Sequence, residues 1–406
     1  MAVIRPFCAV RPAVEYADKV AALPYDVYNR AEAKKEVERE PLSFLAIDRA
    51  ETQFEDSVSV YAPKVYAKAK ELFEERISQG IFIEDKQSAY YIYQLEMNGR
   101  TQTGIAACAS VDDYLDGTIK KHENTREEKE QDRIRHVDTL SAQTGPIFLA
   151  YRSQETINQL VSKIMETQEP LYDFTASDGI AHRMWKVTEE AVITLQEAFA
   201  GIQEIYIADG HHRAASAVKV GLKRRKEHPD YDGTEEFNYF LSVLFPDNQL
   251  MIMDYNRCVK DLHGLTKEAF LKAVEECFDV TVLDGAKHPQ AKGQITMYLE
   301  NRWYLLQAKQ ELLAITDPVA ALDVSLLQEY LLKPVLGIED PRTDERIDFI
   351  GGIRGLEELE RRVQTDMTVA FAMYPTSIGE LFAVADAGLL MPPKSTWFEP
   401  KLRSGL

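Results

Sequence analysis

Three pairs of strand-like segments follow one another closely in the sequence, and this local pairing limits the fold more than any other feature. Residues 88–97 and 101–111 are rich in β-branched and aromatic side chains and flank Asn98-Gly99, a strong hairpin signal. Two further pairs flank short turns, at residues 246–248 and at residues 301–302. Strands joined by short turns pair antiparallel, whereas a doubly wound sheet needs a crossover between its strands. The pattern therefore predicts an α+β fold with a mixed, largely antiparallel sheet.

Helical patterns flank these strands. Residues 29–39 and 63–79 contain strong helix formers and are followed by Pro41 and Gly80, so we expect two surface helices. Residues 324–336 and 378–387 are expected as late helices, with a buried strand over residues 368–373 between them.

The domain boundary is poorly marked, because the chain has no internal repeat and no low-complexity linker. A length of 406 residues allows two or three domains. We expect an N-terminal α/β region over residues 1–200 and a second region over residues 201–406, with a soft boundary. Candidate functional residues come from both regions, so we expect them to share one site.

Composition excludes several classes of function. The chain has 47 Lys and Arg against 66 Asp and Glu, a net charge of −19, which disfavours binding to the phosphate backbone of nucleic acids. No apolar run reaches the roughly 18 residues of a membrane span, and the N-terminus lacks the apolar core of a signal peptide. The four cysteines form no CxxC pair, which argues against a zinc site or a disulfide scaffold. We expect a soluble, cytoplasmic protein that contacts no membrane, and any anion must be held by a local basic cluster.

The sharpest local feature lies at residues 205–213. A strand-like run over residues 205–208 leads into Asp209-Gly210, and a helical pattern opens with His211-His212-Arg213. At such a junction the free amides and the positive end of the helix dipole point at one spot, while Gly210 lets the backbone approach a ligand. Two imidazoles and a guanidinium would complete an anion cradle, so the segment predicts a phosphate-binding site.

Other interpretations of this segment exist. Asp209 can be an ordinary helix cap, one histidine can be buried, and Arg213 can pair with a surface carboxylate. For Asp209 alone the cap is favoured. For the whole cluster we favour the phosphate site, because strand-to-helix turns rarely gather three groups able to carry positive charge. A metal site made of the two histidines is less favoured, since neighbouring side chains on a helix point about 100° apart.

A second candidate is the segment Lys120-Lys121-His122-Glu123-Asn124-Thr125, which opens a mostly charged run to residue 135. Glu123 beside Asn124 can hold a divalent cation while the lysines meet phosphate oxygens. The alternative is a solvated helix or a mobile loop, which is the usual meaning of such a run. The residues alone leave these two interpretations even.

Two shorter segments add candidates. Residues 388–398 have P-loop spacing, but Pro393 replaces the second glycine and the segment follows a helix, so we reject a P-loop. Lys394 and Ser395 remain as polar groups that either contact a ligand or anchor the tail. Asp26, in Pro24-Tyr25-Asp26-Val27, either forms a turn or supplies a carboxylate for proton transfer or metal binding.

Taken together, these motifs resemble a widespread prokaryotic family known as domain of unknown function 1015. The matching segments occur in the same order: Arg5-Pro6-Phe7, Pro24-Tyr25-Asp26-Val27, Lys121-His122-Glu123-Asn124-Thr125, Ala208-Asp209-Gly210-His211-His212-Arg213, Leu322-Asp323-Val324-Ser325 and Met391-Pro392-Pro393-Lys394-Ser395-Thr396-Trp397-Phe398. The resemblance covers almost the whole chain.

The Asp-Gly-His-His-Arg motif is also similar to the phosphate motif of the ParB and sulfiredoxin-like superfamily, which includes free-serine kinases that use ADP or ATP and partition proteins that bind CTP. This resemblance implies a ParB-like core in which residues 209–213 meet nucleotide phosphates. The His-Glu-Asn-Thr segment is similar to a partition-protein motif near the triphosphate and its metal, although the order is reversed and Glu127 stands where an arginine is expected. By position only, Asp26 would correspond to the carboxylate base of the free-serine kinases.

The resulting hypothesis is a kinase that transfers a phosphoryl group from ATP or ADP to a small-molecule hydroxyl, with free L-serine as the acceptor that the resemblance implies. Asp26, Asp209, His211 and His212 are the candidate catalytic residues, and Glu123 is the candidate Mg²⁺ ligand. The other candidates bind the nucleotide: Lys121, His122, Asn124, Gly210, Arg213, Lys394 and Ser395. The alternative is a non-catalytic switch that binds CTP or ATP and acts through a protein partner. The acceptor, the preferred nucleotide and the oligomeric state stay open.

Overall fold

The computed structural model describes residues 1–406 and divides them into two compact units. The first unit contains Met1–Leu250 together with Pro400–Leu406, and the second contains Met251–Glu399. The second unit is therefore inserted into the chain of the first. The sequence places the boundary near residue 200, whereas the units divide after Leu250. The reason is that strands β10 (Ile205–Asp209) and β11 (Tyr239–Pro246) pair with strands from the first 200 residues.

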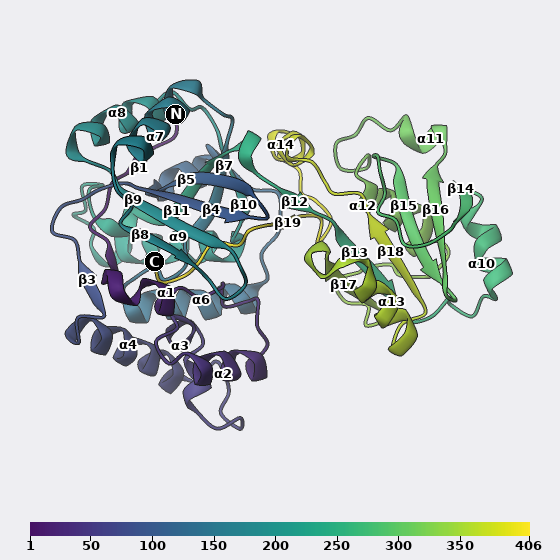
Figure 1. The fold of residues 1–406 in the computed structure, drawn as a ribbon, viewed down its shortest axis with the longest axis horizontal. Helices are drawn as coiled ribbons and strands as arrows, with labels where there is room; N and C mark the ends of the chain where they lie inside the picture. Colours follow the sequence, from purple (N-terminus) through teal and green to yellow (C-terminus); the bar gives the residue numbers. More distant parts are fainter. The chain divides into compact units, whose positions relative to one another are not determined.

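The first unit is built on a nine-stranded sheet in the order β6-β10-β7-β11-β5-β4-β9-β8, with β1 paired to β5 (Figure 1). Only β6 with β10 and β7 with β11 run parallel, and all other pairs are antiparallel. The predicted α+β fold with a mixed, largely antiparallel sheet is thus confirmed. The remaining strands are β1 (Ile4–Arg5), β4 (Tyr91–Met97), β5 (Arg100–Ser110), β6 (Ile119–Lys120), β7 (Ile147–Tyr151), β8 (Tyr172–Thr175) and β9 (Ala181–Lys186).

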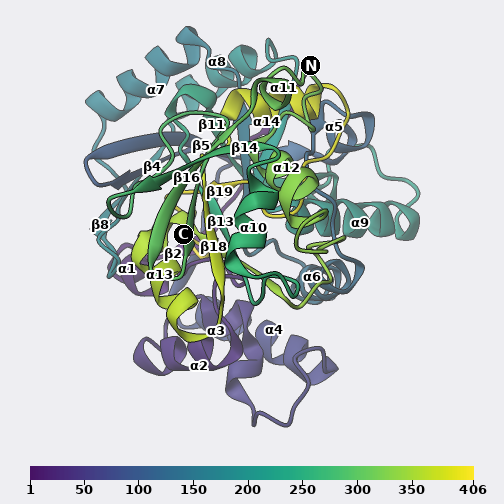
Figure 2. The same cartoon turned by 90° about the vertical axis from the view of Figure 1, so that its right-hand side faces the viewer.

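One face of this sheet is covered by helices. Apolar side chains of α5 (Val111–Asp116), α7 (Glu155–Thr167), α8 (Glu189–Phe199) and α9 (His211–Glu227) form one core with alternate residues of the strands. Helices α7 and α8 pack side by side, as both views show (Figures 1 and 2). Because side chains alternate along a strand, the intervening residues of β4, β5 and β11 point to the opposite face.

A second core lies among the N-terminal helices of the first unit. It joins α1 (Ala17–Val20), α2 (Arg30–Arg39), α3 (Leu45–Asp48) and α4 (Pro63–Ser78) to the end of α6 (Glu127–Leu140) and to β3 (Phe82–Glu84), which pairs with β2 (Val10–Pro12). Helix α2 begins with a capping box in which Asn29 and Glu32 exchange hydrogen bonds with each other's backbone amides. The two predicted surface helices, α2 and α4, are confirmed.

The second unit is a six-stranded antiparallel sheet in the order β14-β16-β15-β18-β13-β17. Its strands are β13 (Tyr255–Val259), β14 (Phe278–Leu283), β15 (Gln294–Leu299), β16 (Arg302–Ala308), β17 (Ile347–Gly351) and β18 (Val369–Met373). A short separate pair joins β12 (Ile252–Met253) to β19 (Trp397–Phe398). The helices are α10 (Lys267–Val274), α11 (Gln310–Leu313), α12 (Asp323–Leu327), α13 (Gly355–Thr365) and α14 (Ile378–Asp386).

Two of the three predicted hairpins are present. Strands β4 and β5 pair across Asn98 and Gly99, whose φ angles of 54° and 76° suit a tight hairpin turn, and β15 pairs with β16. The predicted hairpin around residues 246–248 is wrong, because the chain leaves the first unit at Leu250 and β12 pairs with β19 instead. The helix predicted over residues 324–336 is shorter: α12 ends at Leu327 and a π-helical turn follows over Gln328–Leu332.

No helix is both long enough and apolar enough to span a bilayer.

Candidate functional site

The predicted strand-to-helix turn at residues 209–213 is present in the first unit. Strand β10 ends at Asp209, Gly210 adopts a φ of 94°, and α9 begins at His211. The positive φ favours glycine here, and a Cβ atom at Gly210 would lie 3.0 Å from Nε of Arg213, so the guanidinium would have to shift. No side chain caps the first turn of this 17-residue helix. Its N-terminal amides are therefore available to an anion.

Asp209 is held as a carboxylate by its neighbours. Its Oδ2 lies 3.1 Å from Nζ of Lys401, and its Oδ1 accepts the N–H of Gly210 at 2.8 Å. Burial alone would raise the pKa of Asp209, but Lys401 and Arg213 outweigh burial and hold that pKa well below its ordinary value. Asp209 is therefore a fixed negative charge that positions Lys401 and the turn. No sequence pattern pointed to Lys401, which lies 192 residues away in the chain.

His211 and His122 form a buried pair beside this turn. Their rings meet edge to face with centroids 4.5 Å apart, and the backbone N–H of His122 points at Nε2 of His211 at 3.5 Å. Burial lowers the pKa of His122 to about 4 and that of His211 well below 6.5. Both imidazoles are neutral at pH 7, so His211 adds no positive charge to the cradle, unlike the expectation from sequence.

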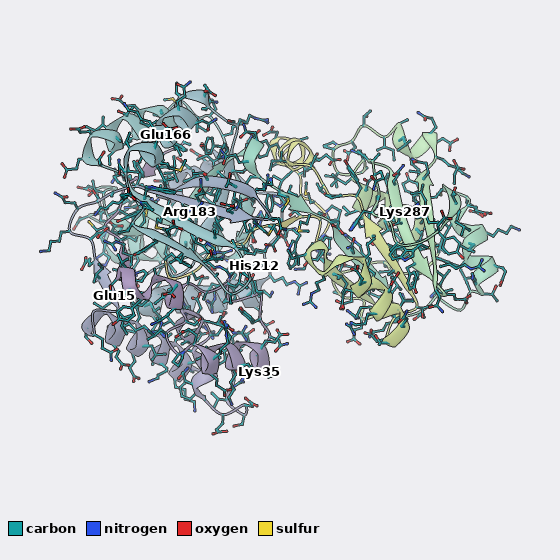
Figure 3. The ribbon with its side chains drawn as sticks, in the orientation of Figure 1. Glu15, Lys35, Glu166, Arg183, His212 and Lys287 are labelled. Atoms are coloured by element: carbon teal, nitrogen blue, oxygen red, sulfur yellow. The ribbon has the colours of Figure 1, made fainter.

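The second candidate segment docks on the first turn of α9. Oε2 of Glu123 lies 3.8 Å from Nδ1 of His211, and the N–H of Arg126 donates to Nε2 of His212 at 2.9 Å. Figure 3 labels His212 on this helix. Lys121 and Asn124 are exposed on the same segment. The structure thus brings two motifs that lie 86 or more residues apart into one place.

A Mg²⁺ site can be tested against these contacts. The chain contains no cluster of three or more His, Cys, Asp or Glu side chains arranged for a metal ion. Glu123 is the only acid among the candidate residues of this segment, and it is partly exposed. Mg²⁺ is commonly held by one or two carboxylates together with substrate phosphates, so Glu123 fits a metal that arrives with a nucleotide.

Arg213 turns its guanidinium toward a second loop. Nη1 donates a hydrogen bond to the carbonyl of Pro146, and a Cβ atom on Gly145 would lie 3.4 Å from Cδ of Arg213. At this point Arg213 lines a small cavity of about 20 Å³ together with Tyr25 and Arg133. An adjoining cavity of about 230 Å³ shares Tyr25 and Arg133 and is lined by Asp26. Pro24 and Tyr25 thus line the same small cavity as Arg213, and Asp26 lines the adjoining one.

Between these two cavities lies a buried polar cluster that sequence reasoning missed. Asp48 accepts a hydrogen bond from Oγ1 of Thr144 at 2.7 Å and lies 3.9 Å from Nη1 of Arg133. The Arg133 guanidinium also stacks 4.1 Å from the ring centre of Tyr25. Burial, together with the charge of Arg133, lowers the pKa of His136 to about 4, and Nδ1 of His136 has no hydrogen-bond partner. Arg133 falls within the charged run that ends at residue 135, but no sequence pattern joins it to Asp48.

Lys394 and Ser395 belong to the second unit. The carbonyl of Lys394 accepts a hydrogen bond from Nη2 of Arg257 at 3.0 Å, and the Ser395 hydroxyl donates to the carbonyl of Pro392 at 2.6 Å. Nζ of Lys394 lies 5.5 Å from the ring centre of Tyr255. The Lys394 contacts hold this loop against β13, and ligand binding by Lys394 and Ser395 stays a prediction.

Comparisons with known proteins give a family and several weak structural likenesses. A family model described as "Protein of unknown function (DUF1015)" matches residues 4–325. No curated protein matches the chain. Among solved structures, a mutant free serine kinase in complex with AMP has a TM-score of 0.36 and 13% identity, covering 74% of this chain and 92% of its own. A mutant free serine kinase in complex with ADP has a TM-score of 0.36 and 13% identity, and the match covers 75% of this chain and 93% of the kinase. Staphylococcus aureus SbnI with a C-terminal truncation has a TM-score of 0.39 and 12% identity, and the match covers 73% of this chain and 85% of SbnI.

Proposed function

The chain belongs to the family described as protein of unknown function (DUF1015), and from its own geometry we propose that it transfers a phosphoryl group from ATP or ADP to the hydroxyl of a small molecule. The observation that carries this proposal is the start of α9, which no side chain caps and beside which Arg213 and Lys401 stand. Free helix amides and fixed cations together form a phosphate site in a chain whose net charge is −19.

The nucleotide phosphates would contact the amides of the first turn of α9 and the guanidinium of Arg213. His212 accepts the N–H of Arg126 through Nε2, which holds its ring beside the first turn of α9. Asp209 acts through Lys401 and Gly210, which it holds by an ion pair and a hydrogen bond. Glu123 would hold Mg²⁺ against the phosphate oxygens, where the ion neutralises charge on the transferred group.

The acceptor would occupy the cavity of about 230 Å³ on the other side of Tyr25. The acceptor oxygen attacks the terminal phosphorus, the bond from that phosphorus to the bridging oxygen of the nucleotide breaks, and the hydroxyl proton passes to a carboxylate. Asp26 lines this cavity, is exposed, and is our candidate for that carboxylate. Free L-serine is the first acceptor to test, followed by other small hydroxyl compounds.

The test is a transfer assay on the full chain with ATP or ADP, Mg²⁺ and a panel of hydroxyl compounds, followed by ³¹P NMR. We expect Arg213→Ala to weaken nucleotide binding about 10- to 100-fold, since a hydrogen bond between charged groups contributes about 1.5–3 kcal/mol. Lys226→Ala is the matched control, because Lys226 is exposed near the other end of α9. Circular dichroism establishes that both variants are folded.

Two results would revise the proposal. If Arg213→Ala binds ATP and ADP as tightly as Lys226→Ala, the phosphate site is not at this turn. If nucleotide binding is lost in Arg213→Ala but no hydroxyl compound is phosphorylated, the protein is a nucleotide-dependent switch and Asp26 has no role as a proton acceptor.

A further inference from the structure

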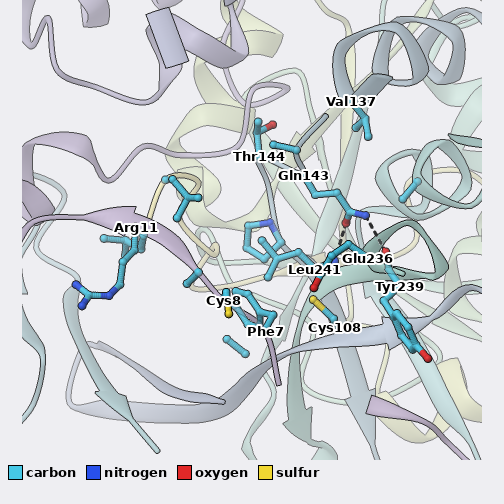
Figure 4. Close-up of a pocket in the computed structure, with 18 of the residues that line it drawn as sticks. Phe7, Cys8, Arg11, Cys108, Val137, Gln143, Thr144, Glu236, Tyr239 and Leu241 are labelled. Carbon is cyan, nitrogen blue, oxygen red and sulfur yellow. Dashed lines mark hydrogen bonds between the residues drawn. The ribbon is translucent and has the colours of Figure 1, made fainter. Parts of the chain in front are cut away.

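A large cavity of the first unit lies against the sheet face that points away from the α7 and α8 core, and Figure 4 shows residues that line it. Its volume is about 530 Å³, within the usual range for sites that bind small organic molecules. The sheet contributes the outward-facing residues of β4, β5 and β11, among them Tyr91, Cys108 and Leu241. Helices α6 and α9 contribute Val137 and Val220.

The lining combines aromatic rings with uncharged polar groups. Phe7 and Tyr91 lie with ring centroids 5.5 Å apart, and Tyr93 and Tyr239 add two more rings to the wall. Gln143 reaches into the same wall and binds the backbone of Tyr239 and Leu241, as Figure 4 shows with dashed lines. Aromatic walls with a few polar edges suit a flat ring that carries hydrogen-bonding groups.

The three arginines that line this cavity are paired with carboxylates. Arg11 pairs with Asp85, Arg224 pairs with Asp138, and Arg403 pairs with Asp178. Burial raises the pKa of Cys108 above its ordinary value, so its thiol is neutral. Two exposed acids, Glu84 and Glu236, also line the cavity, so it offers no free cation for a phosphate and favours a group without negative charge.

A narrow neck that Arg213 lines lies at one end of the cavity. Val137, Gln143, Thr144 and Ala217 line both this cavity and the small cavity that contains Arg213 and Arg133. Ala217 and Arg213 are one turn apart on α9. A ligand whose uncharged ring fills the large cavity can thus direct an anionic end along α9 toward Arg213.

From this arrangement we infer that the large cavity is the nucleoside subsite, with the base against the aromatic wall and the 5′ end facing the neck. The inference rests on the proposed phosphate site at the start of α9. Three adjoining cavities would then hold, in order, the nucleoside, the phosphates beside Arg213 and Arg133, and the acceptor beside Asp26.

The first experiment fills the cavity without touching the phosphate site. Cys108→Phe places a ring into the cavity, and Cys108→Ala at the same position is the matched control. We expect Cys108→Phe to weaken ATP or ADP binding roughly tenfold or more by calorimetry, and to leave inorganic tripolyphosphate within about twofold of the native protein. Cys108→Ala should bind both ligands like the native protein. Unchanged nucleotide affinity in a folded Cys108→Phe protein would overturn the inference and leave the phosphate site standing.

A second experiment measures binding in the cavity with ligands that carry no phosphate. Adenosine, guanosine, cytidine and uridine are added separately at millimolar concentration, and modification of each cysteine by a maleimide is followed by peptide mass spectrometry. Cys8 also lines this cavity and is exposed, so the matching nucleoside should slow modification of Cys8 and leave that of Cys277, in the second unit, unchanged. If no nucleoside slows modification of Cys8, the nucleoside subsite is excluded. If nucleosides protect Cys8 but tripolyphosphate does not bind, the cavity assignment holds and the proposed phosphate site fails.

Discussion

Gly221 is the point at which α9 comes closest to the segment before β11, and replacing it with alanine tests how tightly this helix is held. A Cβ atom at Gly221 would lie 2.5 Å from the carbonyl oxygen of Phe237, where ordinary contact begins at 3.4 Å. Phe237 lies in the short 3₁₀ helix Glu236–Asn238, so the obstructing atom is backbone and cannot rotate away. Helix α9 or that turn must therefore shift.

Two opposing effects set the size of the change. Alanine is favoured over glycine inside a helix by about 0.8–1.0 kcal/mol. Overpacking a closely packed site costs about 1–3 kcal/mol, and an overlap with backbone belongs at the upper end of that range. We therefore expect Gly221→Ala to destabilise the first unit by about 1–2 kcal/mol, which corresponds to a fall in Tm of roughly 2–8 °C for a unit of this size.

Hydrogen exchange measured by mass spectrometry over a urea series gives the free energy of unfolding of each unit separately. Gly379→Ala in α14 is the matched control, because the nearest atom to its added Cβ is the Ser377 hydroxyl at 4.0 Å. That control should stabilise the second unit by about 0.5–1 kcal/mol. A Gly221→Ala protein at least as stable as the native one would show that α9 and the Glu236–Asn238 turn are not rigidly packed, and the reasoning about this contact would fail.

Further predictions concern pH and helix capping. Burial lowers the pKa of His122 to about 4 and that of His182 to about 3. In the unfolded chain both histidines take up a proton below about pH 6.5, so the first unit should lose stability as the pH falls from about 6.5 toward 4. Each such histidine contributes a slope of about 1.4 kcal/mol per pH unit, and urea midpoints that stay constant over this range would contradict the assignment of neutral imidazoles. Burial raises the pKa of Asp323 to about 6, so its carboxylate form costs stability above that pH. Asp323→Asn keeps an oxygen that accepts the N–H of Gly293. Urea unfolding should show this variant to stabilise the second unit by about 1–2 kcal/mol at pH 7.5 but not at pH 4. Equal effects at both pH values would refute the charge argument. Asn29→Ala removes the capping box of α2 and should destabilise the first unit by about 1 kcal/mol in thermal unfolding, whereas Glu38→Ala, exposed on the same helix, should have little effect.

Local features were predictable from sequence. The β4–β5 hairpin follows from Asn98-Gly99 between two β-rich runs, and the β10–α9 turn follows from a glycine between a strand pattern and a helix pattern. In each case the residues that determine the structure are neighbours in the chain. The hairpin predicted at residues 246–248 failed because β12 pairs with a strand more than 140 residues later, which no local pattern encodes.

The candidate site was predictable only in part, for the same reason. The phosphate-binding motif stands in one stretch of sequence, but its ion pair with Lys401 and the cluster of Asp48, Arg133 and His136 join distant segments. The neutral state of His211 depends on burial beside His122, and burial is a property of the packed chain. Sequence reasoning therefore located the turn and misjudged its charge.

The insertion of the second unit sets an order of events during synthesis. A ribosome completes residues 1–250 and then makes all of Met251–Glu399 before the last segment of the first unit, Pro400–Leu406, emerges. That segment supplies Lys401 to Asp209, Arg403 to Asp178, and Ser404 to a backbone bridge with Ala22. Early domains usually fold as they are made, but this one is still missing the lysine that neutralises Asp209. The candidate site is consequently completed only after the whole of the second unit has been made, so a chain that stops before Lys401 carries the motif without its electrostatic partner.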